Sequence, residues 1–187
     1  MKYLIAGLGN IGEEYRNTRH NIGFLIADTL AASGKQTFSP VRYGTIAQMK
    51  YRGRMLMILK PSTYMNLSGK AVKYWITKEN IPLENLLVIS DDIDLNIGVL
   101  RMKAKGSGGS HNGLNNIIEE LGTTDFPRLR FGIGRNFFAG QQIDFVLGQW
   151  TPEEKIIIEE RKKIAVEMIK NFIMAGINDT MMRYNNK

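Results

Sequence analysis

The chain opens with a compact apolar run at residues 2–7 (KYLIAG), which ends in glycine and predicts a buried β-strand. A polar stretch follows. Apolar positions then return at helical spacing over residues 21–34, where Gly34 has the position of a helix C-cap. The start of the sequence therefore predicts a strand, a long loop and a helix.

Two β-rich segments, roughly 41–51 and 54–60, are separated by a turn-prone Arg-Gly pair, and this pattern predicts a β-hairpin. Ser68 is a candidate N-cap for a helix that extends to about residue 79. A helix is therefore expected directly after the hairpin.

Strands and helices continue to alternate in the second half of the chain. Residues 84–90 (ENLLVIS) predict a buried strand, which is followed by the acidic turn DDID. A strand near 98–105 leads into the glycine-rich GSGGSHNG and then a helix to about Leu121. Residues 128–134 (RLRFGIG) predict another strand.

Thr151, Pro152 and Glu154 have the pattern of a capping box with proline at the first helical position. They predict the start of an amphipathic helix that Gly176 ends. The whole pattern predicts one α/β domain over residues 1–187, with a mixed, twisted β-sheet covered by helices and a long C-terminal helix. Loops at the carboxyl ends of such strands usually carry the functional site.

Composition and charge narrow the class of protein. The 187 residues are 43% hydrophobic, enough for one sizeable core, and the formal net charge of +7 indicates an anionic partner. No acidic residue occurs between Asp28 and Glu79, a segment that holds many basic ones. A solvated basic surface that maintains solubility is an equally good interpretation, so charge alone does not identify RNA.

The chain has no cysteine, which excludes a disulfide framework and a thiolate metal site. Its first apolar stretch is too short for a signal peptide, and no run of about 18 apolar residues occurs. We therefore expect a soluble, cytoplasmic protein without a membrane partner.

The glycines of residues 7–12 (GLGNIG) match the G-x-G-x-x-G fingerprint of dinucleotide-binding folds. That fingerprint requires a helix that begins at the third glycine and an acidic residue at the end of a second strand. Here the following residues are polar and aperiodic, and Asp28 lies inside the helical pattern. An NAD-binding fold remains a competing interpretation, whereas no P-loop or G-x-S-x-G pattern occurs.

His20 lies in a polar loop at a helix start, where it is either a general base or an ordinary capping or surface histidine. Asp91, at a strand end, could fix the tautomer of such a base and stabilise its cation, although DDID is also a common kind of acidic turn. With two histidines, no cysteine and no H-E-x-x-H pattern, we expect no metal.

Three loop asparagines near glycines are candidates for substrate orientation and oxyanion stabilisation, or serve turns. They are Asn10, Asn66 and Asn112. Three cations alternate with apolar residues, so on a strand they would share one face and could follow a phosphate backbone. They are Arg101, Lys103 and Lys105.

Taken together, four segments resemble the bacterial-type peptidyl-tRNA hydrolase family. They are GLGNIGEEYRNTRHNIGF, KPSTYMNLSG, SDDIDLNIGVLRMKAKGSGGSHNGL and FPRLRFGIG, and they cover nearly the whole chain in order. The resemblance implies hydrolysis of the ester between the peptide and the 3′-terminal ribose of peptidyl-tRNA, which recycles tRNA after premature release from the ribosome. It also implies tRNA as partner, a monomer and no cofactor.

The resemblance implies that His20 activates water and that Asp91 orients His20, with lesser roles for Asp92 and Asp94. Asn10, Asn66 and Asn112 are implied to bind the peptide main chain, to position water or the terminal ribose, and to stabilise developing negative charge. Tyr15 and Met65 are implied to line the substrate-binding cleft. The residues implied to contact tRNA phosphates are Arg101, Lys103 and Arg130, with Lys105 as a further candidate on the same stripe.

One position departs from part of the family, because Ser90 stands where some relatives carry histidine. The alternative function is that of a noncatalytic RNA-binding relative of the same fold. Retention of His20 and Asp91 argues against that alternative.

Overall fold

Four parallel strands, each rich in apolar residues, form the centre of a seven-stranded sheet, as expected where helices bury both faces. In spatial order they are β4 (Arg54–Pro61), β1 (Lys2–Gly7), β5 (Leu86–Asp92) and β7 (Arg128–Gly132). Antiparallel strands complete both sides: β3 (Gly44–Tyr51) and β2 (Ser39–Val41) beside β4, and β6 (Leu100–Lys103) beside β7. This computed structural model describes residues 1–185.

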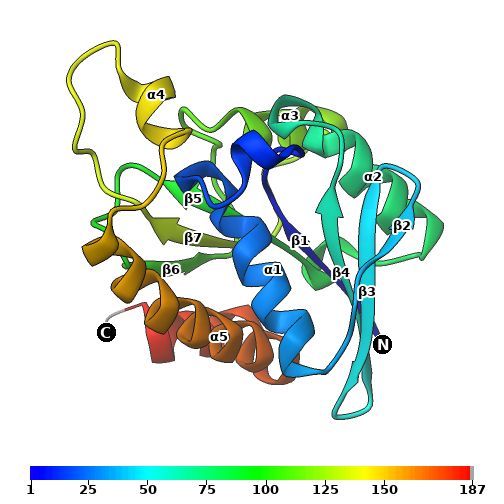
Figure 1. Ribbon diagram of the computed structural model, residues 1–187. Helices are drawn as coiled ribbons and strands as arrows, with labels where there is room; N and C mark the ends of the chain where they lie inside the picture. The colour runs from blue at the N-terminus through cyan, green and yellow to red at the C-terminus, as the bar shows by residue number, and fades with distance from the viewer. Residues whose placement is uncertain (186–187) are drawn as a thin grey trace.

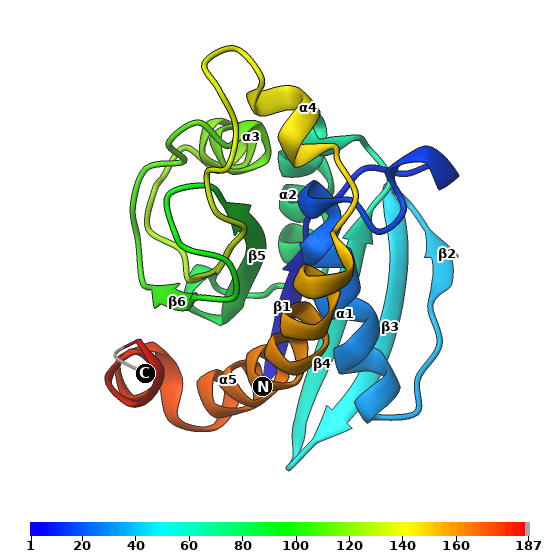
Figure 2. The ribbon, with the colours of Figure 1, turned by 60° about the vertical axis from the view of Figure 1, so that its left-hand side comes forward.

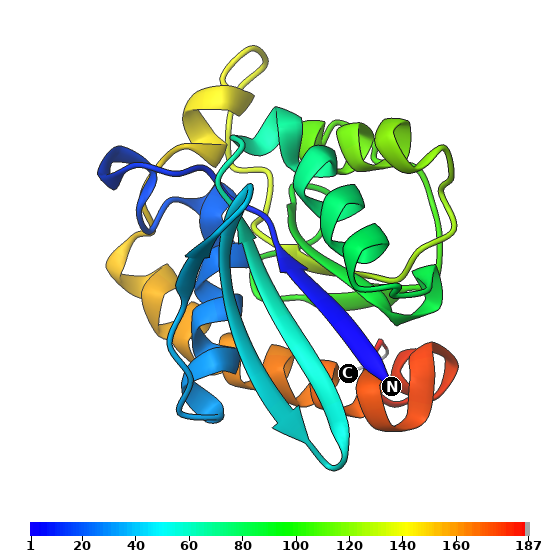
Figure 3. The ribbon, with the colours of Figure 1, turned by 90° about the vertical axis from the view of Figure 1, so that its right-hand side faces the viewer.

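Helices cover the two faces of the sheet (Figures 1 and 3). On one face lie α1 (Ile22–Ser33) and α5 (Pro152–Tyr184), and on the other lie α2 (Ser68–Lys78) and α3 (Asn112–Leu121). A short helix, α4 (Gln142–Val146), and the loop before it protrude at one end of the molecule. Single 3₁₀ turns occur at Glu13–Tyr15, Arg19–Asn21, Met65–Leu67 and Leu83–Asn85.

Two glycines bring α1 against β1. A Cβ atom on Gly7 would lie 2.2 Å from the carbonyl oxygen of Gly23, and one on Gly23 would lie 2.4 Å from the backbone nitrogen of Leu8. Gly12, with a φ of 117°, is followed by the single 3₁₀ turn Glu13–Tyr15, and α1 begins only at Ile22. The first glycine of GLGNIG thus serves helix–strand packing, and because no α-helix begins at the third glycine, the structure argues against a dinucleotide site.

The predicted strands, hairpin and helices are present, with three differences in detail. Ser68 is the first residue of α2 rather than its N-cap, and its hydroxyl donates to the carbonyl of Met65 at 2.8 Å. The strand predicted over 98–105 is confined to β6, because Gly98 and Gly106 have positive φ and turn the chain at both sides. Lys105 therefore lies in a bend beyond the strand.

The third difference concerns the C-terminal helix. The capping box of Thr151 and Glu154 is present, with Pro152 as the first helical residue. Gly176 interrupts α5 with φ 83°, but a further helical segment continues to Tyr184 instead of ending there. Figure 2 shows this last segment turned away from the main axis of α5 and lying beside β6. Among the described residues, no helix combines the length and hydrophobicity that crossing a membrane requires.

Candidate active site

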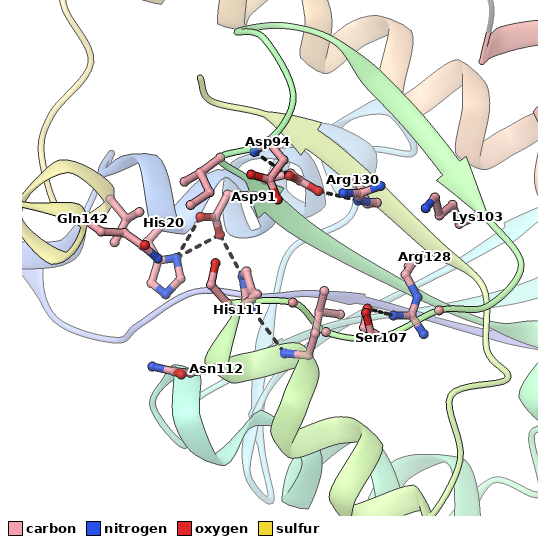
Figure 4. Close-up of a pocket in the computed structure, with 18 of the residues that line it drawn as sticks. His20, Asp91, Asp94, Lys103, Ser107, His111, Asn112, Arg128, Arg130 and Gln142 are labelled. Carbon is pink, nitrogen blue, oxygen red and sulfur yellow. Dashed lines mark hydrogen bonds and ion pairs between the residues drawn. The ribbon is translucent and has the colours of Figure 1, made fainter. Parts of the chain in front are cut away.

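Three ionisable side chains meet near the carboxyl ends of the central strands. Asp91 is the second-last residue of β5, His20 lies in the 3₁₀ turn between β1 and α1, and His111 is the N-cap residue of α3. They line one cavity of about 250 Å³. Figure 4 shows both imidazole rings directed toward the Asp91 carboxylate.

His20 contacts Asp91 through one ring nitrogen. Its Nδ1 lies 2.9 Å from Oδ1 and 3.0 Å from Oδ2 of Asp91, whose side chain is only 3% exposed. A neutral His20 therefore carries its proton on Nδ1 and donates it to the carboxylate. The Nε2 atom, on the other side of the ring, keeps a lone pair that can accept a proton from water.

His111 contacts the same carboxylate oxygen as His20. Its Nε2 lies 2.9 Å from Oδ1 of Asp91, and its Nδ1 accepts the backbone N–H of Leu114 at 3.2 Å. A neutral His111 thus has its proton on Nε2 and donates it to Asp91. Sequence reasoning missed this contact, although the position of His111 directly before a predicted helix is a signal for an N-cap.

The charges of the two catalytic candidates are mutually dependent. Burial lowers the pKa of His20, but the charge of Asp91 and its hydrogen bond outweigh burial and leave that pKa above 6.5. Burial raises the pKa of Asp91, yet His20 and His111 together hold it well below its ordinary value. Asp91 is therefore ionised at neutral pH, while His20 is poised to exchange a proton.

His20, Asp91 and His111 are also a possible metal-ligand set by residue type, since their ligand atoms lie within 4.8 Å of one another. The hydrogen bond from Leu114 argues for a different use. It leaves the Nε2 of a neutral His111 protonated, without the lone pair that a metal needs. The distances of 2.9 Å from Nδ1 of His20 and Nε2 of His111 to Oδ1 of Asp91 are those of direct hydrogen bonds.

Asn10 and Met65 are joined by a hydrogen bond. The backbone N–H of Met65 donates to Oδ1 of Asn10 at 2.7 Å. The amide of Asn21 in turn holds the backbone N–H and C=O of Asn10, each at 2.8 Å. Asn10 therefore connects the loop after β1 to the loop after β4, and it lines a second cavity of about 600 Å³ rather than the one at His20.

The other predicted contact residues are more dispersed. Asn112 is exposed at the start of α3 and lines the same cavity as His20. Met65 is buried beside Gly113, where an added Cβ would lie 2.6 Å from its Sδ. Asn66, which is exposed, and Tyr15, which is half-buried, do not line the cavity of His20.

Cations form one wall of the cavity. Lys103 and Arg130 line it, and Arg130 forms an ion pair with Asp92. Arg128, which sequence reasoning did not single out, is 1% exposed and donates to the carbonyls of Ser107 and Thr124. Burial, with a smaller contribution from Arg130, lowers the pKa of Arg128 to about 10, so this buried group is still a cation at neutral pH.

The other two basic residues predicted to contact tRNA lie outside this wall. Arg101 is exposed on β6 and Lys105 on the loop that follows, and neither lines the cavity. The predicted stripe on one strand face is therefore reduced to Arg101 and Lys103, with Lys105 beyond the end of the strand. Asp94 pairs with Arg135 at the surface.

A carboxylate-bound imidazole at a cavity with a cationic wall has the groups of a hydrolase that activates water against an anionic substrate. Comparison with known proteins identifies the family of hydrolases to which the chain belongs. Residues 4–187 match the family described as peptidyl-tRNA hydrolase. The chain belongs to the peptidyl-tRNA hydrolase family, and its activity is the hydrolysis of peptidyl-tRNA.

Individual relatives agree over the whole length. The chain is 58% identical over 187 residues to a peptidyl-tRNA hydrolase of Phocaeicola vulgatus, with 100% of both chains covered. It is 56% identical over 185 residues to that of Porphyromonas gingivalis, covering 99% of this chain and 100% of the relative. The crystal structure of peptidyl-tRNA hydrolase from Acinetobacter baumannii superposes with a TM-score of 0.92 at 33% identity, covering 98% of this chain and 94% of the other.

Proposed function

We propose that the protein cleaves the ester between the peptide and the 3′-terminal ribose of peptidyl-tRNA, with His20 as general base and Asp91 as the residue that orients it. The shared hydrogen bonds of Asp91 are the observation that carries this proposal. They direct the proton of His20 toward Asp91 and leave its Nε2 as the acceptor. The ionised state of Asp91 favours the imidazolium that forms during the reaction.

The proposed reaction needs only water and the side chains of the site. Nε2 of His20 takes a proton as a water oxygen attacks the ester carbonyl, which gives a tetrahedral intermediate with negative charge on its oxygen. The intermediate collapses as the bond to the ribose 3′ oxygen breaks, and the imidazolium returns a proton to that leaving oxygen. The products are a peptide with a free carboxyl group and tRNA with a free 3′ hydroxyl.

The asparagines are proposed to act on both sides of the ester. Asn112, in the wall of the His20 cavity, is placed to donate to the developing negative charge. Asn10 fixes Met65 through the 2.7 Å bond and so sets the position of the following Asn66. We assign Asn66 and Tyr15 to contacts with the peptide or the terminal ribose.

The cations are proposed to contact the RNA. Lys103 and Arg130 on the cavity wall, with Arg101 beside them on β6, are placed to bind phosphates near the acceptor end of tRNA. Lys105 extends this group into the loop after β6. We further propose that the protein acts as a monomer in the cytoplasm, where ribosomes release its substrate.

Hydrolysis of an N-acetyl-aminoacyl-tRNA tests the proposal. We expect the native chain to release the acylated amino acid. We expect His20→Ala to bind tRNA but not to release the amino acid. Asn178→Ala, at an exposed position on α5, is the control variant and should keep native activity. Binding of tRNA by the native chain without any release would replace the proposal with a noncatalytic RNA-binding role.

A further inference from the structure

The edge strand β6 has an unusual neighbour. It is only four residues long and occupies the end of the sheet, with β7 on one side and no strand on the other among the described residues. An exposed strand edge leaves backbone N–H and C=O groups without partners. Here the side chain of Asn185 takes the place of the missing strand at one residue, Met102.

Asn185 pairs with both backbone groups of Met102. The N–H of Met102 donates to Oδ1 of Asn185, and Nδ2 of Asn185 donates to the carbonyl of Met102, each at 2.8 Å. A carboxamide presents one donor and one acceptor side by side, as a peptide unit does. This two-point contact therefore reproduces the pairing that one residue of an eighth strand would make.

The pairing has a consequence for the orientation of the neighbouring cations. Met102 lies opposite Leu129 in the antiparallel register, and its outward-facing backbone groups mark this as a pair without hydrogen bonds to β7. Its side chain is fully buried on the face of the sheet that α1 and α5 cover. Arg101 and Lys103, one residue to each side, therefore project from the opposite face.

We propose that Asn185 is a positioning residue for RNA binding, which fixes the backbone of β6 so that Arg101 and Lys103 are held in place for phosphates. This inference rests on the proposed function of those two cations. The last helical segment of the chain, bent at Gly176 so that it lies beside β6, carries Asn185 to the strand (Figure 2). The segment between Gly176 and Asn185 thereby contributes to substrate binding without touching substrate.

β6 pairs with β7 along its inner edge, and Asn185 holds its outer edge at Met102. Glycines with positive φ lie on both sides of it, Gly98 before and Gly106 after, and the following loop is rich in glycine. Because Asn185 holds the backbone of β6, Arg101 and Lys103 lose less conformational entropy when RNA binds. The affinity for RNA is therefore higher. Loss of the amide group loosens the outer edge of β6 while leaving the hydrogen bonds of His20 and His111 to Asp91 intact.

The test compares Asn185→Ala with native protein and with Asn178→Ala, which removes an exposed asparagine from the same helical segment. Three quantities are measured for each: the hydrogen-exchange rate of the Met102 amide, the affinity for deacylated tRNA over a range of salt, and kcat/KM on a short substrate without phosphates, an N-acetyl-aminoacyl ester of adenosine. For Asn185→Ala we expect faster exchange at Met102 and weaker tRNA binding. The slope of log K against log salt should be shallower by about 0.7–0.9 for each phosphate contact that is lost.

The short substrate separates positioning from general damage. Its kcat/KM should match the native value in Asn185→Ala, and Asn178→Ala should match native protein in all three measurements. Unchanged tRNA affinity and salt slope, despite faster exchange at Met102, overturn the inference. So does an equal loss on the short substrate and on tRNA, because that result indicates a purely structural role.

A charge reversal distinguishes failure of this inference from failure of the function on which it rests. In the double variant Arg101→Glu with Lys103→Glu, tRNA affinity should fall further than in Asn185→Ala. If the double variant weakens binding and Asn185→Ala does not, only the role of Asn185 is wrong. If the double variant binds tRNA as the native chain does, the placement of RNA on β6 is wrong, and the inference is overturned with it.

Discussion

His20 and His111 contact the same oxygen of Asp91, each at 2.9 Å. The two histidines have different roles in this arrangement, because the backbone N–H of Leu114 fixes the tautomer of His111 while Nε2 of His20 is left for water. His111 thus acts as a second donor that holds the carboxylate and withdraws part of its negative charge. This relationship predicts opposite effects for substitutions at His111 and Asp91.

Replacing His111 with alanine should raise the pKa of His20. Without the hydrogen bond from His111, more of the Asp91 charge acts on His20, which favours the imidazolium. Because the neutral imidazole is the active base, the rising limb of the pH–rate profile should move to higher pH. Single-turnover hydrolysis from pH 5 to 9 measures this shift, and a midpoint at or below the native one would contradict it.

Replacing Gly113 with alanine should lower activity with little effect on tRNA binding. The added Cβ would lie 2.6 Å from Sδ of Met65 and 3.0 Å from Cε1 of His111, so one of these side chains must move. We expect kcat to fall by roughly 10-fold or more, because a shift of His111 moves Asp91, its hydrogen-bond partner, which in turn orients His20. Steady-state kinetics with a tRNA affinity measurement test this, and native kcat would show that Met65 moves without consequence.

Replacing Gly7 with alanine should destabilise the whole fold. The new Cβ would lie 2.2 Å from the carbonyl oxygen of Gly23, a backbone atom that cannot move without shifting α1 from β1. The free energy of unfolding should fall by about 1–3 kcal/mol or more, as measured by urea denaturation. Gly53→Ala is the contrasting variant, since its site is open and only its positive φ is strained; an equal loss in both would refute the packing explanation.

Replacing Arg19 with lysine should weaken the link between the His20 loop and α4. Arg19 is 8% exposed, donates to Glu154 at 2.8 Å and to the carbonyl of Phe145 at 3.2 Å, and lies 4.4 Å over the ring of Phe145. Lysine keeps the charge but loses the planar, multiple contact. We expect lower kcat and faster proteolysis at α4, and unchanged values of both would show that the link is dispensable.

The sequence was sufficient for the order of the elements and for the main candidates at the site. Apolar runs predicted β1, β5 and β7, and the capping box predicted the start of α5, because these signals are local. The pairing of His20 with Asp91 came from the family resemblance, since residues 71 positions apart carry no local signal of contact.

What sequence reasoning missed depends on the tertiary arrangement. The role of His111 follows from where α3 places its N-cap, and the short α4 has too few residues for a periodic pattern. Gly176 was expected to end the helix, but contacts with β6 stabilise a further segment beyond it. No local sequence pattern marks Arg128, because its partners are the carbonyl groups of Ser107 and Thr124, in two loops that only the fold brings to it.

The pH dependence of single-turnover hydrolysis, compared between native protein and Asp91→Asn, tests the His20–Asp91 couple most directly. Native activity should rise with pH through a midpoint above 6.5, since the base must be neutral and Asp91 raises its pKa. In Asp91→Asn the plateau should fall by about 100-fold or more, and the midpoint should drop below the native one, because burial of His20 then acts without the opposing charge. An unchanged midpoint, or a flat native profile between pH 5 and 8, would contradict the assignment of His20 as the base and Asp91 as its partner.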